Sequence, residues 1–226
     1  MLSSPVVVTL LAAVAAYFVC GIPFGLVIAS RMSGIDVRKT GSGNIGMTNV
    51  ARSAGGKAAA LTFLCDVGKG TVSVLLGKWV VAAACFGGDF QALAPDGPNG
   101  WVGSVLFLAC VFGHVFSPYL HFHGGNGRSV GLGSSLGMCW PVGLGAFAVF
   151  LAITIPTRLV SAGSIAAAAV LPVFAFVLGV RGLAIVPCII VAIVVIWSHR
   201  ENLGRLLRGE ERKFSIGKDK GKGDAK

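Results

Sequence analysis

A basic, glycine-rich stretch between residues 38 and 52 has the composition of an anion-binding loop. It reads RKTGSGNIGMTNVAR. Glycines let backbone N–H groups approach a phosphate closely, while hydroxyl, amide and guanidinium groups add hydrogen bonds and charge. The alternative is a basic loop whose polar side chains only cap helices. The candidate phosphate-binding residues in this stretch are Arg38, Gly41, Ser42, Gly43, Asn44, Thr48, Asn49 and Arg52.

The same stretch contains a literal G-x-G-x-x-G, the spacing found in dinucleotide-binding loops. That fingerprint depends on a β-strand before it and a βαβ unit around it. Here a long apolar segment and a basic run come before it. We therefore predict an anion site and no nucleotide cofactor.

A second candidate phosphate site lies at residues 113–128, GHVFSPYLHFHGGNGR. A Gly-Gly-x-Gly turn beside an arginine suits a phosphate, and the alternative is an ordinary turn between two spans. No carboxylate stands near the three histidines, so a metal site is not predicted. The candidate binding residues are Gly124, Gly125, Asn126, Gly127 and Arg128.

Two further pairs combine residue types that can move or hold a proton. Asp66 and Lys69 stand three residues apart inside an apolar segment. They either only neutralise one another or, as ionisable residues within a membrane segment, belong to a functional site. We count Lys69 among the phosphate-binding candidates. His199 and Asn202 share a helix face where the last apolar segment ends. His199, oriented with Asn202, is the candidate general base, and a substrate phosphate is the alternative proton acceptor.

Several familiar enzyme classes are excluded by the residues that they need. No aspartate follows any of the four histidines in the His-x4-Asp spacing of soluble-domain acyltransferases. One aspartate lies within an apolar segment, too few for the metal cluster of alcohol phosphotransferases. The six cysteines form no CxxC and read as small buried apolar residues. We expect neither a cofactor nor a metal.

The elements that must position these residues are membrane helices. Of the 226 residues 54% are hydrophobic and 12% charged, against about 25% charged in a soluble domain. Spanning a hydrocarbon core takes about 20 helical residues, so the chain is predicted to be an all-α, polytopic membrane protein. The segment 58–87 is predicted to be interrupted by DVGKG at 66–70. The six apolar segments are 5–30, 58–87, 101–120, 134–156, 160–180 and 183–198.

Charge along the chain predicts the orientation. Residues 31–57 and 199–226 hold fourteen of the nineteen Lys and Arg, whereas 88–100 holds two aspartates and neither Lys nor Arg. The positive-inside rule places the first two in the cytoplasm and the third outside. An outside N-terminus and a cytoplasmic C-terminus require an odd number of crossings, so one segment must cross twice or be re-entrant. The charge does not predict a nucleic-acid partner, because no soluble basic domain is present to hold one.

Five stretches, in order and over nearly the whole chain, resemble the bacterial membrane acyl-phosphate:glycerol-3-phosphate acyltransferases of the PlsY type. The resemblance implies about seven membrane helices, an N-terminus outside and a cytoplasmic active site in the inner membrane. It implies one transmembrane domain over 1–209 and a flexible, charged cytoplasmic tail over 210–226. The matching stretches are GSGNIGMTNVAR (41–52), DVGKG (66–70), GHVFSPYLHFHGGNGR (113–128), TRLVSAGSI (157–165) and HRENLGRLLRG (199–209).

The family's reaction gives the expected function. It transfers a fatty acyl group from acyl phosphate to the sn-1 hydroxyl of glycerol 3-phosphate, which yields lysophosphatidate and phosphate for phospholipid synthesis. The expected partners are these substrates, the lipid bilayer and the enzyme that makes acyl phosphate. A second hypothesis is a transporter of an organic phosphate, with the glycine-rich loops at a broken helix.

Two departures distinguish this chain from the family pattern. The family's glycine loop reads Gly-Gly-Lys-Gly-Val, whereas here Asn126 replaces the lysine and Arg128 the valine. The phosphate-binding cation is therefore predicted to have moved by two positions. Met47 stands where alanine is usual.

Overall fold

The computed structural model describes residues 4–214, and every regular element within that range is helical. Four short 3-10 turns stand in the connections: η1 (Val37–Lys39), η2 (Phe90–Leu93), η3 (Pro118–Leu120) and η4 (Gly182–Ala184). The α-helices are α1 (Pro5–Gly21), α2 (Phe24–Ser33), α3 (Met47–Ser53), α4 (Gly56–Cys85), α5 (Trp101–Val115), α6 (Arg128–Met138), α7 (Trp140–Thr157), α8 (Val160–Val177), α9 (Ile185–Ser198) and α10 (Arg200–Leu207).

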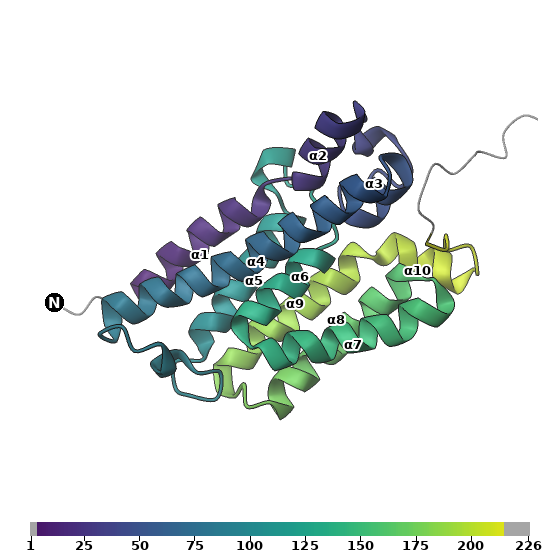
Figure 1. Cartoon of the computed structure of the whole chain (residues 1–226). Coiled ribbons are helices and arrows are strands. Elements are labelled where there is room, and N and C mark those ends of the chain that lie inside the picture. Colours follow the sequence, from purple (N-terminus) through teal and green to yellow (C-terminus); the bar gives the residue numbers. More distant parts are fainter. Residues whose placement is uncertain (1–3, 215–226) are drawn as a thin grey trace, which may run out of the picture.

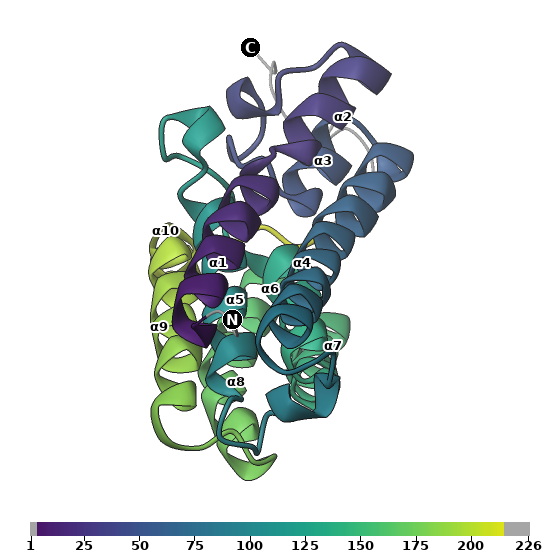
Figure 2. The ribbon, with the colours of Figure 1, turned by 90° about the vertical axis from the view of Figure 1, so that its left-hand side faces the viewer.

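The long helices form an elongated bundle (Figure 1). α5 and α6 lie between the α1–α4 pair and the group formed by α7, α8 and α9, an arrangement that Figure 2 shows from a second direction. Of the candidate membrane spans in the described residues, Trp101–Leu120, which contains α5, has the largest buried share. The bundle thus surrounds the helix that leads into the second glycine-rich stretch.

The first apolar segment, predicted as one helix, is broken between Gly21 and Phe24. α1 stops at Gly21 and α2 starts at Phe24, because Pro23 has no N–H to continue the ladder. The two helices still pass together as one candidate span over residues 5–33. The break leaves the carbonyl of Ile22 available to a side chain from another helix, and Lys69 takes it at 2.8 Å.

The predicted interruption of segment 58–87 is wrong. α4 runs without a break for 30 residues, through the DVGKG stretch. The helix tolerates this stretch because Asp66 and Lys69 form a buried ion pair with 2.8 Å between Nζ and Oδ1. Polar side chains at this depth need partners inside the protein, and these two have them.

The segment predicted at 134–156 is two helices rather than one. α6 ends at Met138, Cys139 adopts an extended conformation, and α7 begins at Trp140. α6 lies against α4, α5 and α7, so its serines and glycines are covered by protein and need not be apolar. This short helix adds a passage along the bundle that the apolar segments of the sequence do not reveal.

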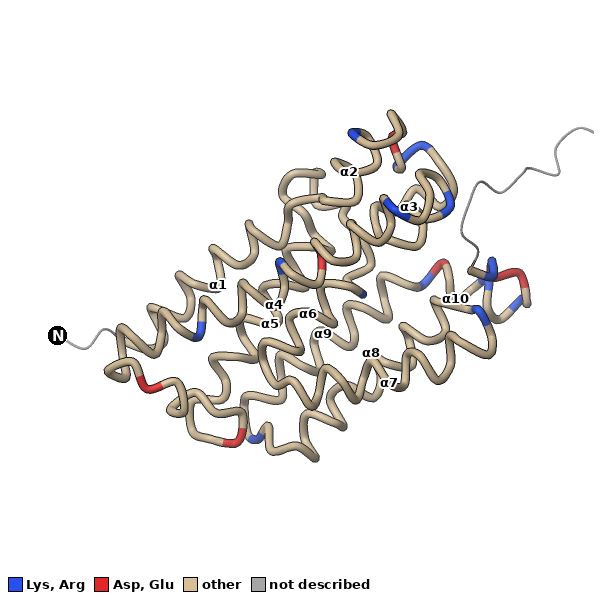
Figure 3. The backbone as a smooth tube through the Cα atoms, viewed as in Figure 1, with Lys and Arg blue, Asp and Glu red and all other residues tan. Residues whose placement is uncertain are grey.

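The prediction of an all-helical, polytopic membrane protein is confirmed. Within residues 4–214, five segments are long and apolar enough to span a membrane, or six with the bent pair α9–α10. Counting the shorter α6, the chain passes along the bundle seven times, so α1 begins at the end opposite α10 (Figure 1). Lys and Arg gather at the end formed by α2, α3 and α10 (Figure 3).

The outer surface of the bundle is apolar, as lipid contact requires. Large side chains point outward along the helices, among them Leu11, Leu64, Trp79, Ile155 and Val177, which are 62–71% exposed. On a water-soluble protein such a surface would promote association. Here it matches the hydrocarbon of a bilayer.

The helices α4 and α6 approach one another through glycines. A Cβ on Gly133 would lie 2.0 Å from the carbonyl oxygen of Val67, and one on Gly70 would lie 2.8 Å from that of Val130. Small residues at such a crossing let two backbones meet, which is a common means of helix association in membranes. The contact sets where α6, and therefore Arg128 at its start, lies relative to α4.

We expect Gly133→Ala to destabilise the protein by about 1–3 kcal/mol, because the added methyl group meets backbone rather than a movable side chain. Gly131→Ala is the matched control, since a Cβ there has nothing within 4 Å. Thermal unfolding of both variants in detergent measures the difference. Equal midpoints for the two variants would contradict the close crossing.

The first residues after the boundary predicted at 209 are also part of the described structure. Residues 210–214 lie against the bundle, where the Phe214 N–H donates to the Arg158 carbonyl at 2.8 Å and the Glu211 side chain makes several hydrogen bonds. The rest of the predicted tail, 215–226, lies outside the described residues.

Candidate functional site

The first glycine-rich stretch forms a tight loop around the buried side chain of Asn49. The Asn49 amide donates to the carbonyls of Val37, Thr40 and Asn44, and its Oδ1 accepts from the Ser42 N–H at 2.9 Å. Gly41 has φ +60°, and a Cβ there would lie 2.2 Å from Asn49 Oδ1. Asn49 therefore shapes the loop from beneath.

The two glycine-rich stretches, 82 residues apart, are joined by a pair of asparagines. Asn44 Nδ2 donates to Asn126 Oδ1 at 2.7 Å, while Asn44 Oδ1 accepts from the Gly46 N–H. The carbonyl of Asn126 accepts from Ser198 Oγ at 3.1 Å. Three segments predicted to carry chemistry thus meet at one place, at the basic end of the bundle.

The second glycine-rich stretch rests on the end of α5. The Gly124 N–H donates to the carbonyl of Val115, and the Gly125 N–H to that of His114. Gly127 has φ +79°, a left-handed conformation that glycine adopts readily, and it turns the chain into α6. Arg128 is consequently the first residue of α6, directed into the bundle.

A polar cavity opens where these segments meet. It is lined by residues from both loops, the ends of α8 and α9, α10 and the segment after it. Ser161, Trp197, Ser198 and Glu211 line it although the sequence had not singled them out. The predicted site residues in its wall are Gly41, Ser42, Gly43, Asn44, Thr48, Asn49, Arg52, Gly124, Gly125, Asn126, Arg128 and Asn202.

Arg52 on α3 and Arg128 at the start of α6 both supply cations to this cavity. Arg52 donates to the carbonyls of Arg212 and Lys213, at 3.2 and 3.4 Å. Arg128 is partly buried, and within residues 4–214 no hydrogen bond or ion pair to its guanidinium is found. A cation so placed has donors to offer a phosphate.

Glu211 is a functional candidate that sequence reasoning missed. Its carboxylate accepts hydrogen bonds from Ser161 Oγ, Asn202 Nδ2 and Arg205 Nε, all within 2.9 Å. Burial raises its pKa, but these hydrogen bonds and the Arg205 charge outweigh that and leave the pKa below its usual value. Glu211 is therefore ionised at neutral pH and ties α8, α10 and the C-terminal segment together. The signal available in the sequence was an acidic pair, Glu210 and Glu211, inside a basic segment.

His199 is fully buried beside the polar cavity, at the break between α9 and α10. Its Nδ1 lies 2.7 Å from the carbonyl of Val195, which can only accept, so Nδ1 bears the hydrogen and Nε2 has the lone pair in the neutral ring. Among residues 4–214 no partner is found for the buried Nε2. Asn202 does not orient this ring as expected, because its side chain bonds to Glu211 instead.

Two predicted phosphate ligands lie away from the cavity. Lys69 is 7% exposed and faces the carbonyl of Ile22 and the ring of His114, in the interior of the bundle. Arg38 points into solvent and binds Asp36 through two hydrogen bonds. Gly127, at the turn into α6, lines the neighbouring apolar cavity rather than the polar one.

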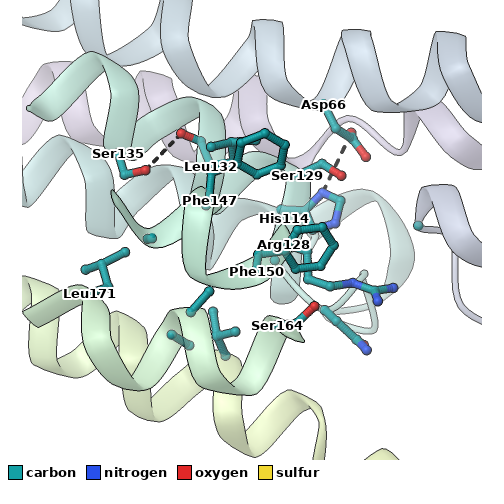
Figure 4. Close-up of a pocket in the computed structure, with 18 of the residues that line it drawn as sticks. Asp66, His114, Arg128, Ser129, Leu132, Ser135, Phe147, Phe150, Ser164 and Leu171 are labelled. Atoms are coloured by element: carbon teal, nitrogen blue, oxygen red, sulfur yellow. Dashed lines mark hydrogen bonds and ion pairs between the residues drawn. The ribbon is translucent and has the colours of Figure 1, made fainter. Parts of the chain in front are cut away.

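An apolar cavity joins the polar one and extends into the bundle (Figure 4). Asn44, Thr48, Asn126, Arg128 and Val160 line both. Its deeper wall is formed by Phe63, Phe107, Leu132, Phe147, Phe150, Ala167 and Leu171. The cavity has a volume of about 130 Å³.

The chemistry available at this site is therefore anion binding at the end of an apolar channel. Donors and cations lie at the junction, and apolar side chains lie below it. Among residues 4–214 no group of three or more His, Cys, Asp or Glu side chains could hold a metal ion. The arrangement suits a ligand with a phosphate at one end and a hydrocarbon chain at the other.

Comparison with known proteins gives a consistent set of similarities. The family model described as "Glycerol-3-phosphate acyltransferase" matches residues 10–209. A protein of that name from Rubrobacter xylanophilus is 40% identical over 202 residues, which cover 88% of this chain and 91% of its own. One from Geobacter sulfurreducens is 41% identical over 199 residues, with 88% and 94% covered.

A solved structure has the same arrangement of helices. The crystal structure of PlsY, described as an integral membrane glycerol 3-phosphate acyltransferase, superposes in its glycerol 3-phosphate form with a TM-score of 0.78. The sequence identity is 35%, and the match covers 92% of this chain and 96% of that one.

Proposed function

The chain belongs to the glycerol-3-phosphate acyltransferase family of bacterial membrane lipid synthesis, and from this premise we propose that its acyl donor is acyl phosphate. The products are then 1-acylglycerol 3-phosphate, which is lysophosphatidate, and inorganic phosphate. In the reaction the sn-1 hydroxyl oxygen forms the new ester bond to the acyl carbon. The bond between that carbon and the phosphate oxygen breaks, and the hydroxyl proton leaves.

The observation that carries this proposal is the junction of the two cavities. The acyl chain enters the apolar cavity, and the two phosphates lie in the polar one, with the reacting carbonyl near the residues common to both. Asn44, Asn126 and Arg128 line that junction, and Arg52 stands in the polar wall. A donor whose two ends differ so strongly in polarity has one orientation in such a space.

The donor chemistry asks little of the protein beyond positioning and charge. Acyl phosphate is a mixed anhydride with a good leaving group, so we propose direct transfer with neither a metal nor a covalent enzyme intermediate. Two phosphates must approach one another, and Arg52 and Arg128 offset their charge. Holding hydroxyl and carbonyl in contact supplies much of the remaining rate.

We assign the binding of phosphate to loop backbone and side chains together. Ser42, Asn44, Thr48 and four glycines line the polar cavity, and Asn49 holds the first loop in shape. The four glycines are Gly41, Gly43, Gly124 and Gly125. His199 and Asn202 are proposed as the catalytic pair, with the Nε2 of His199 as proton acceptor. Because each has its own partner, they act from neighbouring places rather than as one hydrogen-bonded unit.

The test is an assay of the purified full chain in detergent with palmitoyl phosphate and glycerol 3-phosphate. We expect lysophosphatidate and phosphate in equal amounts, with the ester at the sn-1 position by NMR. Acyl coenzyme A and acyl carrier protein serve as alternative donors in parallel reactions. Product from a thioester alone would overturn the proposed donor.

The transporter hypothesis predicts a different result in the same preparation. Reconstituted into liposomes, a transporter would move labelled glycerol 3-phosphate across the membrane without acylating it. Membership in the acyltransferase family favours the enzyme. Transport without acyl transfer would contradict the proposed enzyme and support the transporter hypothesis.

We propose that the protein lies in the bacterial inner membrane with the polar cavity facing the cytoplasm, where it can meet the enzyme that makes acyl phosphate. The basic end of the bundle supports this orientation (Figure 3).

In a variant without the native cysteines, we expect Ser42→Cys and Arg208→Cys to react with a membrane-impermeant maleimide only after the cytoplasmic side is exposed. Gln91→Cys, in the α4–α5 connection, should react in intact spheroplasts. All three positions are solvent-exposed. The reverse pattern would place the active site outside.

A further inference from the structure

Three ionisable side chains are buried together beneath the second glycine loop. Asp66, Lys69 and His114 are 1%, 7% and 3% exposed. Lys69 Nζ donates to the carbonyl of Ile22 at 2.8 Å, lies 3.2 Å from His114 Nδ1, and forms the ion pair with Asp66. The cluster therefore connects α4, the α1–α2 break and the end of α5, and Figure 4 shows Asp66 facing His114.

The His114 ring is also in contact with the glycine loop. Because the ammonium of Lys69 donates, Nδ1 of the ring accepts, and its hydrogen is on Nε2. A Cβ added to Gly125 would lie 2.3 Å from that Nε2, and the two next nearest atoms also belong to the ring. The His114 side chain therefore limits where Gly125 can lie, and with it the position of the next residue, Asn126.

We propose that Asp66, Lys69 and His114 are positioning residues that set the place of the glycine loop, and with it the affinity for the phosphate of glycerol 3-phosphate. The proposal rests on the proposed function, since it concerns the same cavity. It gives Lys69 a different task from the phosphate binding expected from sequence. The cluster acts through Gly125 on Asn126 and Arg128, which line the cavity.

The energetics of burial favour a defined role for this cluster. A buried charge is costly unless it is paired, and Lys69 has its acceptors and its counter-ion in place. Such a network resists movement, because shifting one member leaves another without its partner. A loop resting on it is held more firmly than one resting on apolar contacts alone.

A double-mutant cycle tests the contact between ring and loop. Gly125→Ala is expected to raise the KM for glycerol 3-phosphate at least about tenfold, because its methyl group meets the His114 ring. His114→Asn keeps an acceptor near the position of Nδ1 and removes the far side of the ring. In that background Gly125→Ala is expected to change KM by less than about threefold, whereas independent effects would multiply.

Gly124→Ala is the matched control within the same loop. Its Cβ would lie 1.9 Å from the carbonyl oxygen of His114, which is backbone, so His114→Asn is expected not to rescue it. Rescue of both glycine variants, rescue of neither, or an unchanged KM in Gly125→Ala would overturn the proposal.

A second variant addresses the ion pair without leaving a charge alone. Asp66→Asn with Lys69→Met removes both charges, so the protein is expected to stay folded, with a raised KM and a kcat that changes less. An unchanged KM would contradict the role given to this pair. The dissociation constant of labelled glycerol 3-phosphate, measured without an acyl donor, gives the same comparison of affinities. It tests the proposal even if the parent does not use acyl phosphate.

Discussion

Replacing Arg128 by alanine is expected to remove most of the acyltransferase activity. The guanidinium lies where the two cavities join, and alanine would leave the phosphate without that charge-assisted hydrogen bond. Such a bond is worth about 1.5–3 kcal/mol, or roughly 10- to 150-fold in affinity. KM values for both substrates, measured with the purified variant, show which phosphate is affected.

A compensating change makes this prediction specific to the displaced cation. Asn126→Lys returns a cation to the place where the family has one, at the cost of the bond from Asn44 to Asn126. Added to Arg128→Ala, it is expected to restore a substantial part of the lost activity. Arg31→Ala, exposed at the same end of the bundle and in neither cavity wall, is the control for charge alone. Parental kinetics in Arg128→Ala would contradict the displaced cation and assign the binding of both phosphates to Arg52.

The second large effect is expected at His199. If its Nε2 accepts the hydroxyl proton, His199→Gln and His199→Asn should each lower kcat by about 100-fold or more. Asparagine can keep the contact to the Val195 carbonyl, so the comparison separates loss of the base from loss of the helix break. Turnover and thermal stability are measured together. A glutamine variant that keeps kcat but loses affinity would assign the proton to a substrate phosphate.

The class of protein and the place of the candidate site can be predicted from the sequence, because hydropathy and charge are patterns that extend over long segments. The apolar runs predict helices, the basic loops predict one end, and the glycine-rich stretches predict phosphate binding. The two glycine-rich stretches do meet, through Asn44 and Asn126. Nothing in the spacing of these two residues indicates that they touch.

The structure differs from the sequence-based expectations where tertiary packing decides what a residue contacts. α6 is glycine- and serine-rich, so hydropathy does not reveal it as a passage, yet protein surrounds it and lipid does not. The sequence suggests Lys69 as a phosphate ligand, whereas in the fold its ammonium donates to the carbonyl of Ile22. Asn202 and Glu211 are nine residues apart across a turn, a pairing that helical periodicity does not describe.

The way in which the polar cavity is closed also bears on how the protein is made. Its walls come from residues as early as Gly41 and as late as Arg212, and Arg52 is bound to carbonyls at 212 and 213. Synthesis proceeds from the N-terminus, and contacts this distant along the chain form last. The membrane helices can therefore be inserted and packed before an active site exists. A ribosome that stops before Glu211 leaves an integrated bundle whose substrate cavity has one wall missing.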